Sequence, residues 1–366
     1  MTWTELHAVS EQFAMDAQQA YRARDIQQAF ELYRLAAESE RQALDQLDVA
    51  KARTRGITAI SAVSLWFKAG CYAQAEQLAY LMLADIYIPE FAREELRNLV
   101  QAIWTESSKQ KAGVAFVPGQ VMVSVKGGEV VTGGAPLDLI VDKVQTIQSM
   151  FYRTIEFVSG VPHRRVGRPT KELQEACRPW LFQSAPGSYQ FSVAIQKPAQ
   201  SDFFKQDIQP ERIAQHFLEI LSASSSDDAK ELEQLVPEEN YRSTFLKLAR
   251  NLAPTGKTFD LIELRASGEL RPVALGLGAR ENINLQLRKK SIEKAEAPEE
   301  LRGILRAVHL DKDWLDVLVD GESVHIIGLQ DAVDDVIGPM VNRPVVVRVI
   351  RTSKSKCKFL DIEPSD

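Results

Sequence analysis

The sequence predicts a multidomain protein with an all-α N-terminal part, a central antiparallel α+β domain and a small C-terminal β-barrel. Three observations lead to this fold class. The chain has 366 residues, more than one hydrophobic core usually covers. Apolar residues recur at helical spacing in the first third of the chain and alternate afterwards. A charged, proline-containing stretch at residues 289–300 precedes a last group of short strands and is expected to be a linker. We therefore expect domains at residues 1–110, 114–290 and 301–364.

The composition is typical of an ordinary globular protein. Hydrophobic residues make up 45% of the chain, charged residues make up 26%, and the formal net charge is −6. An acidic chain is not expected to coat nucleic acid, although a local basic patch is compatible with this charge. The first residues lack the apolar run of a signal peptide, and no segment is long and apolar enough to cross a bilayer. We expect a cytoplasmic protein with no membrane partner.

Two stretches of the N-terminal part share one set of gaps between small and bulky residues. In residues 57–83 these gaps separate Val63, Trp66, Ala75, Ala79 and Met82, and upstream they separate Phe13, Ala17, Ala20, Ala29, Tyr33 and Ala36. Small residues at such intervals let two helices cross closely. Gly70 suits the turn between the helices, because a helix often ends in a left-handed residue. The pattern resembles two degenerate tetratricopeptide repeats.

The spacing between the two stretches is longer than in that family. Ala29 and Ala75 lie 46 residues apart, whereas the family's repeat is about 34 residues long. We therefore expect about three turns of helix, or a linker, to be inserted near residues 37–55. Repeats of this kind do not bury their faces alone, so residues 90–104 are expected to cap the pair as a fifth helix.

The resemblance implies that these helices bind a partner. In the family, the first helix of each pair usually lines a concave groove that holds a protein segment. By position, the groove would present Gln18, Tyr21, Arg22, Ser64, Phe67 and Lys68. The alternative is that the same helices only pack against the next domain.

The central domain is predicted from strand segments with helices between them. The strand segments are residues 117–125, 129–132, 187–196, 258–265 and 271–275. The first two flank a turn at Gly127 and Gly128 and are expected to form a β-hairpin. The predicted helices are Leu137–Val158, residues 210–221, Ala229–Leu235 and Glu239–Leu252. Strands and helices in this order favour an antiparallel α+β domain.

The densest group of basic residues lies between residues 159 and 180. Its core, HRRVGRPTKE, resembles the AT-hook, whose Gly-Arg-Pro core enters the minor groove of A·T-rich DNA. The resemblance implies nucleic-acid contacts, and a phosphate or acidic partner would suit the same residues: Arg164, Arg165, Arg168 and Lys171. The alternative is a structural loop in which Pro169 begins a helix and the arginines pair with neighbouring carboxylates.

The C-terminal segments follow the order strand, strand, strand, helix, strand, strand from Leu301 onward. This order resembles the OB-fold, a small barrel with a helix between its third and fourth strands, and SH3-like barrels are the alternative. OB-folds often bind oligonucleotides with aromatic side chains and a basic groove. Arg351, Lys354 and Lys356 gather at the last hairpin, where they would contact nucleic acid or an anion. The alternative is a solvated hairpin whose charges prevent strand addition.

No segment carries a catalytic or metal-binding signature. The three cysteines are far apart and form no CxxC pair, and the five histidines lack the spacing of zinc ligands. The one catalytic candidate is Cys177 with His163 and Glu175, and a buried, inert cysteine is favoured over it. We expect no metal and no cofactor. Enzymatic activity is uncertain, and the patterns lean against it.

The function predicted from these patterns is that of a non-catalytic, cytoplasmic, bacterial adaptor or regulator that binds a protein partner through the helical groove. The first alternative is a nucleic-acid-associated protein that uses residues 163–171 and the C-terminal barrel. The second alternative is an enzyme of unrecognised type.

Overall fold

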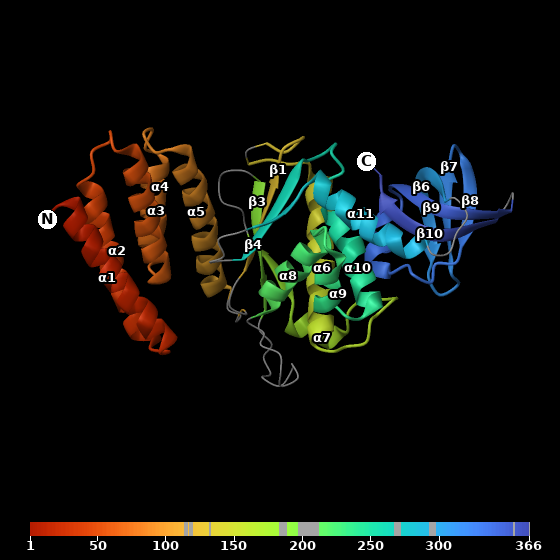
Figure 1. Cartoon of the computed structure of the whole chain (residues 1–366), viewed down its shortest axis with the longest axis horizontal. Helices are drawn as coiled ribbons and strands as arrows, with labels where there is room; N and C mark the ends of the chain where they lie inside the picture. The colour runs from red at the N-terminus through yellow and green to blue at the C-terminus, as the bar shows by residue number, and fades with distance from the viewer. Residues whose placement is uncertain are drawn as a thin grey trace. The chain divides into compact units, whose positions relative to one another are not determined.

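The computed structural model describes residues 1–112, 116, 120–131, 133–182, 189–196, 212–266, 272–292, 298–353 and 356–365. The chain forms two compact units. The first unit comprises Met1–Val114 with Phe182–Ser192, and the second comprises Ala115–Leu181 with Val193–Asp366. The first unit is mainly helical, and the second combines strands and helices with a closed barrel (Figure 1). The predicted multidomain organisation, with helices first and a barrel last, is confirmed.

The helices of the first unit run in alternate directions (Figure 1). They are α1 (Trp3–Arg22), α2 (Ile26–Asp45), α3 (Ala52–Lys68), α4 (Tyr72–Leu83) and α5 (Glu90–Lys111). Local signals set several of their ends. Thr2 and Glu5 form a capping box at the start of α1, and Gly70, with φ of 72°, makes the turn after α3. Residues 37–55 form the last turns of α2, the connecting loop and the first turn of α3.

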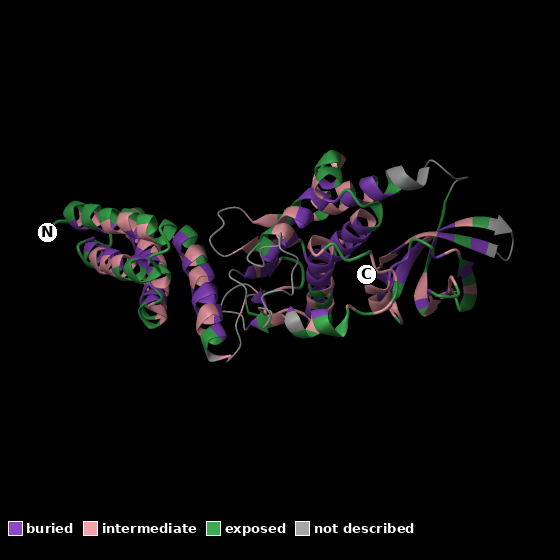
Figure 2. Ribbon diagram, turned by 90° about the horizontal axis from the view of Figure 1, so that it is seen from below, coloured by how far each residue is buried: buried purple, intermediate pink, exposed green. Residues whose placement is uncertain are grey.

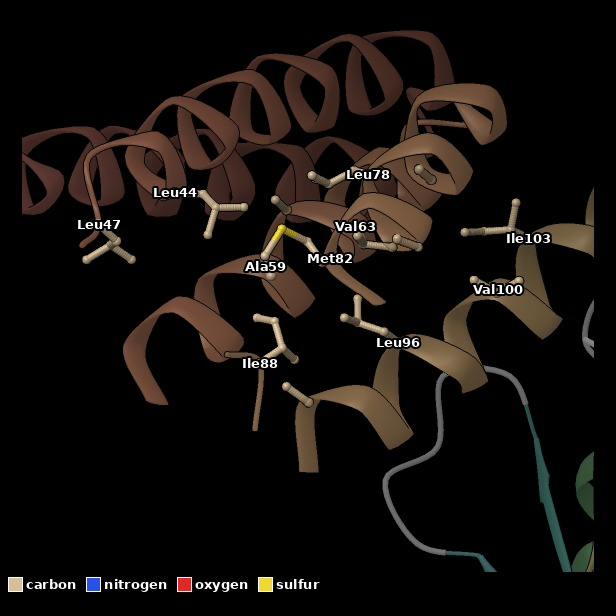
Figure 3. Close-up of a cluster of buried hydrophobic side chains, with 14 residues drawn as sticks. Leu44, Leu47, Ala59, Val63, Leu78, Met82, Ile88, Leu96, Val100 and Ile103 are labelled. Carbon is tan, nitrogen blue, oxygen red and sulfur yellow. The ribbon is translucent and has the colours of Figure 1, made fainter. Parts of the chain in front are cut away.

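Small residues line the crossings between these helices. Within one cluster of apolar side chains, the fully buried alanines are Ala59, Ala62, Ala75, Ala79 and Ala92 (Figure 3). A particularly close approach is at Gly56 of α3, where a Cβ atom would lie 2.9 Å from the Cβ of Ala92 in α5. The cluster therefore holds α3, α4 and α5 at a separation that larger side chains would not permit.

A sheet has the strand order β2-β3-β1-β4-β5. Its strands are β1 (Val121–Lys126), β2 (Pro179–Phe182), β3 (Tyr189–Ile195), β4 (Leu261–Ala266) and β5 (Val273–Leu275). β1 pairs in antiparallel register with β4, and β4 pairs in the same way with β5. Of the predicted strand segments, residues 117–119, 132, 187–188 and 271 lie outside the described residues.

The predicted hairpin is wrong, because β1 pairs with β4 and not with residues 129–131. Gly127 and Gly128 both have left-handed backbone angles, with φ of 78° and 62°. They direct the chain toward the segment before β4, where the Glu129 N–H donates to the Thr258 carbonyl at 2.9 Å. A Cβ atom on Gly128 would lie 2.5 Å from that carbonyl oxygen, so the close approach requires glycine.

The second unit also contains helices (Figure 1). They are α6 (Leu137–Val158), α7 (Lys171–Ala176), α8 (Ile213–Ser225), α9 (Ala229–Leu235), α10 (Glu239–Leu252) and α11 (Leu277–Ile292). The predicted bounds of α6, α9 and α10 are confirmed, and residues 210–211 of the other predicted helix lie outside the described part. Buried side chains are concentrated in this helical layer (Figure 2). Phe151 of α6 stacks on Phe217 of α8 with 4.2 Å between ring centroids.

The predicted bounds of the linker, residues 289–300, are wrong, because both ends of this stretch belong to regular elements. The last residues of α11 and the first residues of β6 (Glu299–His309) fall within it, and residues 293–297 lie outside the described part. Tertiary contacts support this charged helix. Arg280 of α11, for example, pairs with Glu363 at 2.6 Å. The helix is also held by the buried side chains of Ile283 and Leu287.

The C-terminal strands close into a barrel in the order β10-β8-β7-β6-β9, which confirms the predicted small barrel. After β6 the elements are β7 (Trp314–Val319), β8 (Glu322–Ile327), α12 (Asp334–Ile337), the 3-10 turn η2 (Gly338–Met340), β9 (Pro344–Ser353) and β10 (Lys356–Pro364). β10 pairs antiparallel with β9 and parallel with β8, which closes the barrel. Buried side chains of its core include Leu305, Leu315, Val317, Ile326, Val347 and Val349.

Candidate functional site

Most of the residues predicted to line the groove are accessible near the ends of α1 and α3. Gln18, Tyr21 and Arg22 are exposed in the last two turns of α1, and Tyr21 is 56% exposed. On α3, Lys68 is exposed and Ser64 is half-buried. The two helices run in the same direction (Figure 1), so their last turns lie at the same end of the helical unit.

Phe67, the remaining predicted groove residue, is half-buried and belongs to the packing of the helices. Its ring centroid lies 5.7 Å from that of Tyr72, and its side chain packs against the apolar cluster that contains Met82. Truncation of Phe67 would therefore remove core contacts as well as surface. It is unsuitable as a probe of binding.

Tyr33 of α2 connects the exposed residues of α1 and α3. The Lys68 Nζ atom lies 5.8 Å from the centroid of the Tyr33 ring, within the range of a cation–π contact. Burial raises the pKa of Tyr33, and the neighbouring Tyr21 raises it further. We call Tyr21, Tyr33 and Lys68 the tyrosine–lysine patch. The repeat spacing had placed Tyr33 only at the crossing of two helices.

A hollow of about 360 Å³ opens at the other end of α3. It is lined by Arg41, Leu44, Asp45, Arg55, Leu78, Leu81, Met82, Ala84 and Asp85. At its rim Arg41 pairs with Asp45, and Arg55 pairs with Asp85 at 3.1 Å. Three helices and the turn after α4 contribute to the lining, so no local sequence motif could have revealed it.

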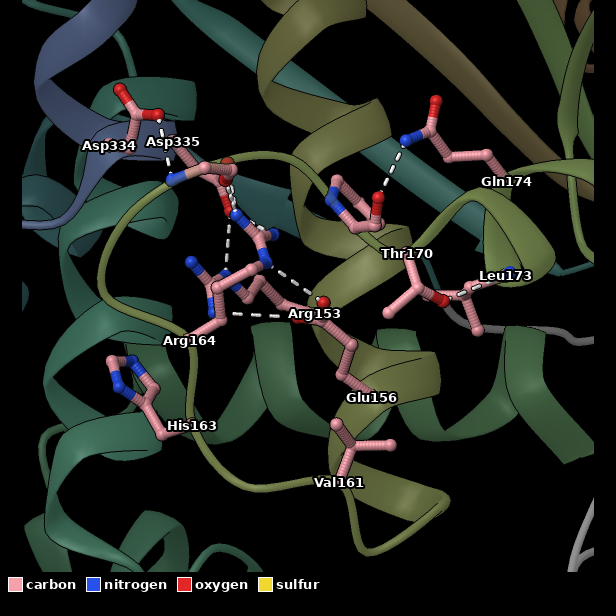
Figure 4. Close-up of polar contacts among 12 residues, drawn as sticks. Arg153, Glu156, Val161, His163, Arg164, Thr170, Leu173, Gln174, Asp334 and Asp335 are labelled. Carbon is pink, nitrogen blue, oxygen red and sulfur yellow. Dashed lines mark hydrogen bonds and ion pairs between the residues drawn. The ribbon is translucent and has the colours of Figure 1, made fainter.

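The basic loop at residues 163–168 belongs to a buried ionic network (Figure 4). Arg153 of α6 is fully buried and donates through Nε to Asp335 of α12 at 2.7 Å. Arg164 donates to the same carboxylate at 3.0 Å and to Glu156 of α6 at 3.0 Å. Two guanidinium groups thus share one carboxylate that follows the barrel strand β8 in the chain.

Arg165 extends the network along the barrel. Its guanidinium donates to Asp313 at 2.8 Å and to the Leu329 carbonyl at 2.9 Å. Its own carbonyl accepts the N–H of Asp334 at 3.0 Å, and the Gly167 N–H donates to the Asp334 carboxylate at 3.1 Å. Side-chain and main-chain hydrogen bonds therefore fasten this loop to the barrel.

A second ionic cluster joins α10 to the last barrel strand. Arg250 of α10 is fully buried and donates to the Asp361 carboxylate at 3.0 Å and to the Ile362 carbonyl at 2.6 Å. Burial alone would raise the pKa of Asp361, but the charge and hydrogen bonds of Arg250 more than offset it, and the pKa is lowered. The helices of the second unit and the barrel are thus connected at two separate places.

Arg168 and Lys171, in the same basic stretch, are exposed. The Lys171 side chain is 85% exposed and has a loose ion pair with Glu175 at 3.7 Å. An AT-hook presents its arginines to the DNA groove, whereas Arg164 and Arg165 are directed toward carboxylates of the same chain. Arg164 and Arg165 therefore form the ion pairs expected of a structural loop. The exposed cations, Arg168 and Lys171, follow them in the chain.

Arg351, near the last hairpin, makes its contacts within the barrel. Arg351 donates twice to Glu299, at 2.8 and 2.9 Å, across the pair β6–β9. Lys354 lies outside the described residues, and only the backbone of Lys356, at the start of β10, is described.

The three residues of the catalytic candidate make different contacts. Burial raises the pKa of the Cys177 thiol to about 12, so the thiol is protonated at neutral pH. The Nε2 atom of His163 lies 2.9 Å from the Thr244 hydroxyl, and its ring meets Tyr241 edge-on at 5.0 Å. In the described part of the chain no contact joins Cys177, His163 and Glu175 to one another.

His163 gives the second unit a pH dependence that can be measured. Burial first, and then the charges of Arg153 and Arg164, lower its pKa to about 4. In the unfolded chain a histidine titrates near pH 6.5, so the unfolded state binds more protons and stability is lost as the pH falls from about 6.5 toward 4. We expect wild type to lose about 1–2 kcal/mol more than His163→Gln between about pH 7.5 and pH 5. Urea denaturation at both pH values tests this, and an equal loss in the two proteins would contradict it.

Comparison with protein-family models, with curated proteins and with solved structures finds no match to this chain. In the part of the chain that the structure describes, no helix is both long and apolar enough to cross a membrane. The same residues contain no group of three or more His, Cys, Asp or Glu side chains that could hold a metal ion. With no similar protein to compare, the functional proposal below is based on the exposed residues described above.

Proposed function

We propose that the protein is a non-catalytic, cytoplasmic adaptor or regulator that binds a segment of another protein through the tyrosine–lysine patch. The observation that carries this proposal is that the exposed Tyr21 neighbours Tyr33 and that the Lys68 ammonium group lies over the same Tyr33 ring. A solvent-exposed tyrosine offers apolar area and a hydroxyl group at a low cost in side-chain entropy. The adjacent ammonium group adds a charge that can meet a carboxylate of the bound segment.

The packing of small residues supports a tetratricopeptide-like helical unit. Ala29 in α2 and Ala75 in α4, the matching positions of the two stretches, are both fully buried. Each lies in the second helix of a pair, whereas Tyr21 and Lys68 come from the first helices, α1 and α3. In stacked helical repeats the faces of successive repeats form one extended binding surface. The patch spans the first helices of both pairs, α1 and α3, and includes Tyr33 of α2.

An OB-type barrel is the second part of the proposal. The closed strand order, the parallel pairing of β8 with β10 and the position of α12 between β8 and β9 support this assignment. The barrel is attached to the helical layer by Arg164, Arg165 and Arg250. Because Arg164 and Arg165 already neutralise carboxylates of the same chain, they are less suited to contact the phosphates of a nucleic acid.

The binding proposal is tested by Tyr21→Ala combined with Lys68→Glu. Both side chains are exposed, so the double variant should fold normally, and recovery of a specific partner should fall by at least about tenfold because an exposed aromatic anchor and its charge are lost together. The measurement is capture from the native host with quantitative mass spectrometry. The 260/280 nm absorbance ratio of the eluate is read at low and high salt.

The matched control is Leu285→Ala combined with Arg288→Glu on α11. Leu285 is 56% exposed, as Tyr21 is, and Arg288 is also exposed, so the control removes similar surface and reverses one charge. A partner recovered with wild type and the control, but lost with the patch variant, supports the proposal. Equal recovery with the patch variant refutes it, and a high absorbance ratio that collapses with added salt favours nucleic acid instead.

A further inference from the structure

The first turns of α2 have an apolar stripe that is open to solvent. Ile26, Phe30 and Tyr33 lie on one face of this helix, because residues three and four apart are neighbours on a helix surface. Ile26 is 42% exposed and Phe30 is 43% exposed. Tyr33 is half-buried, and its ring lies beside the ammonium group of Lys68. The stripe therefore begins at the tyrosine–lysine patch and continues toward the start of α2.

The stripe is open because α3 ends beside it. Further along α2 the same face is covered, since Ala37 is fully buried in a cluster with Leu65 of α3 and Tyr33 packs against this cluster. Lys68, the last residue of α3, lies at Tyr33. About two turns of α2, roughly 10 Å, therefore extend past the end of α3. An apolar face that continues from a core into solvent offers a place for one more helix.

The turn between α1 and α2 places two arginines beside the stripe. α1 ends at Arg22 and α2 begins at Ile26, and in the turn between them Arg24 has a left-handed backbone with φ of 65°. The Arg24 N–H donates to the Tyr21 carbonyl at 3.0 Å, which closes the turn. The 56% exposed side chain of Tyr21 neighbours Tyr33, so both helices contribute to one surface.

The charges around this surface are mainly basic. Arg22, Arg24 and Lys68 are exposed, and within the described part of the chain none of them forms an ion pair. The acidic residues of the same segment are engaged, because Asp25 accepts the first hydrogen bond of α2 and Glu31 pairs with an arginine of that helix. Unpaired cations beside apolar side chains are complementary to a segment that carries carboxylates along an apolar face.

We propose that the segment bound at the tyrosine–lysine patch is an acidic, amphipathic helix that lies along the stripe of α2. Its apolar side chains would cover Ile26 and Phe30, where α3 no longer does. Its carboxylates would meet Arg22, Arg24 and Lys68. This inference rests on the proposed function, because it identifies the kind of segment that the patch binds.

Three synthetic peptides of equal length test the proposal by fluorescence anisotropy with the full chain. The first has leucines at helical spacing and glutamates elsewhere, and the second has lysines in place of the glutamates. The third has the composition of the first in an order without an apolar stripe. The first should bind at least about tenfold more tightly than the others, because only it combines the apolar face with carboxylates. No binding of the first, or equal binding of either other peptide, overturns the proposal.

Two variants locate the glutamate peptide on the chain. Phe30→Ala, and Arg22→Glu combined with Arg24→Asn, should each raise its dissociation constant by at least about fivefold. Both should fold, because these side chains are exposed and asparagine tolerates a left-handed backbone. The matched control is Leu81→Ala, whose side chain is 58% exposed in the last turn of α4 and which should bind as wild type does. Unchanged binding by either stripe variant refutes the proposed placement.

The outcome is separable from that of the partner-capture experiment. If Tyr21→Ala with Lys68→Glu loses the captured partner but wild type does not bind the glutamate peptide, the proposed function stands and this inference fails. If the glutamate peptide is bound through Phe30 but capture is unchanged in that double variant, the proposed function fails and the stripe remains a site for acidic helices.

Discussion

Asp335→Ala is expected to destabilise the second unit by about 3–5 kcal/mol, because it removes one partner of a buried ion pair. The Asp335 carboxylate accepts hydrogen bonds from Arg153 and Arg164, and Arg153 has no exposed surface. Without that carboxylate, two guanidinium groups remain near the single carboxylate of Glu156. The Arg153 guanidinium has no exposed surface through which water could readily replace the lost partner. Urea denaturation followed by tryptophan fluorescence and circular dichroism measures the loss.

Asp331→Ala is the matched control for this prediction. Asp331 lies four residues earlier in the same segment and is exposed, so its replacement should change the free energy of unfolding by no more than about 0.5 kcal/mol. Asp335→Asn keeps the size of the side chain and a hydrogen-bond acceptor but removes the charge, and it should fall between the two. If Asp335→Ala is as stable as Asp331→Ala, the network does not hold the barrel to the helical layer.

Gly303→Ala in β6 is expected to cost about 3 kcal/mol or more, at the upper end of what overpacking causes. A Cβ atom at this position would lie 2.2 Å from the Leu318 carbonyl oxygen and 2.8 Å from a methyl group of Val317, both in β7. Neighbouring Ile304 is paired with Leu318 in the antiparallel ladder. Because the barrel is closed, β6 cannot move away from β7 without straining its pairing with β9.

Gly278→Ala is the control for the glycine prediction. Gly278 lies in α11, and a Cβ atom there would meet no other atom within 4 Å. Alanine is favoured over glycine inside a helix by roughly 0.5–1 kcal/mol, so this variant should be at least as stable as wild type. Thermal unfolding of the two variants side by side gives the comparison. A Gly303→Ala protein that unfolds at the wild-type temperature would contradict the close approach of β6 and β7.

The sequence determined the elements whose signals are local. The bounds of α6, α9 and α10 follow from apolar residues at helical spacing and from the residues that begin each helix, and these signals lie within the segment itself. The alternation of short strands with one intervening helix likewise predicted the barrel. In the helical unit, the spacing selected the exposed residues Tyr21 and Lys68, but it also selected Phe67, which packs into the core.

Tertiary structure alone decided the features whose partners are distant in the chain. β1 pairs with β4, and the charged α11 is supported by Glu363 of the last strand. Besides the nearby Glu156, the carboxylates that bind Arg164 and Arg165 lie far beyond them in sequence, at Asp335 and Asp313. A basic stretch looks the same in the sequence whether its cations face a phosphate or a carboxylate of their own chain. Electrostatic attraction depends on separation in space, and only the folded chain sets that separation.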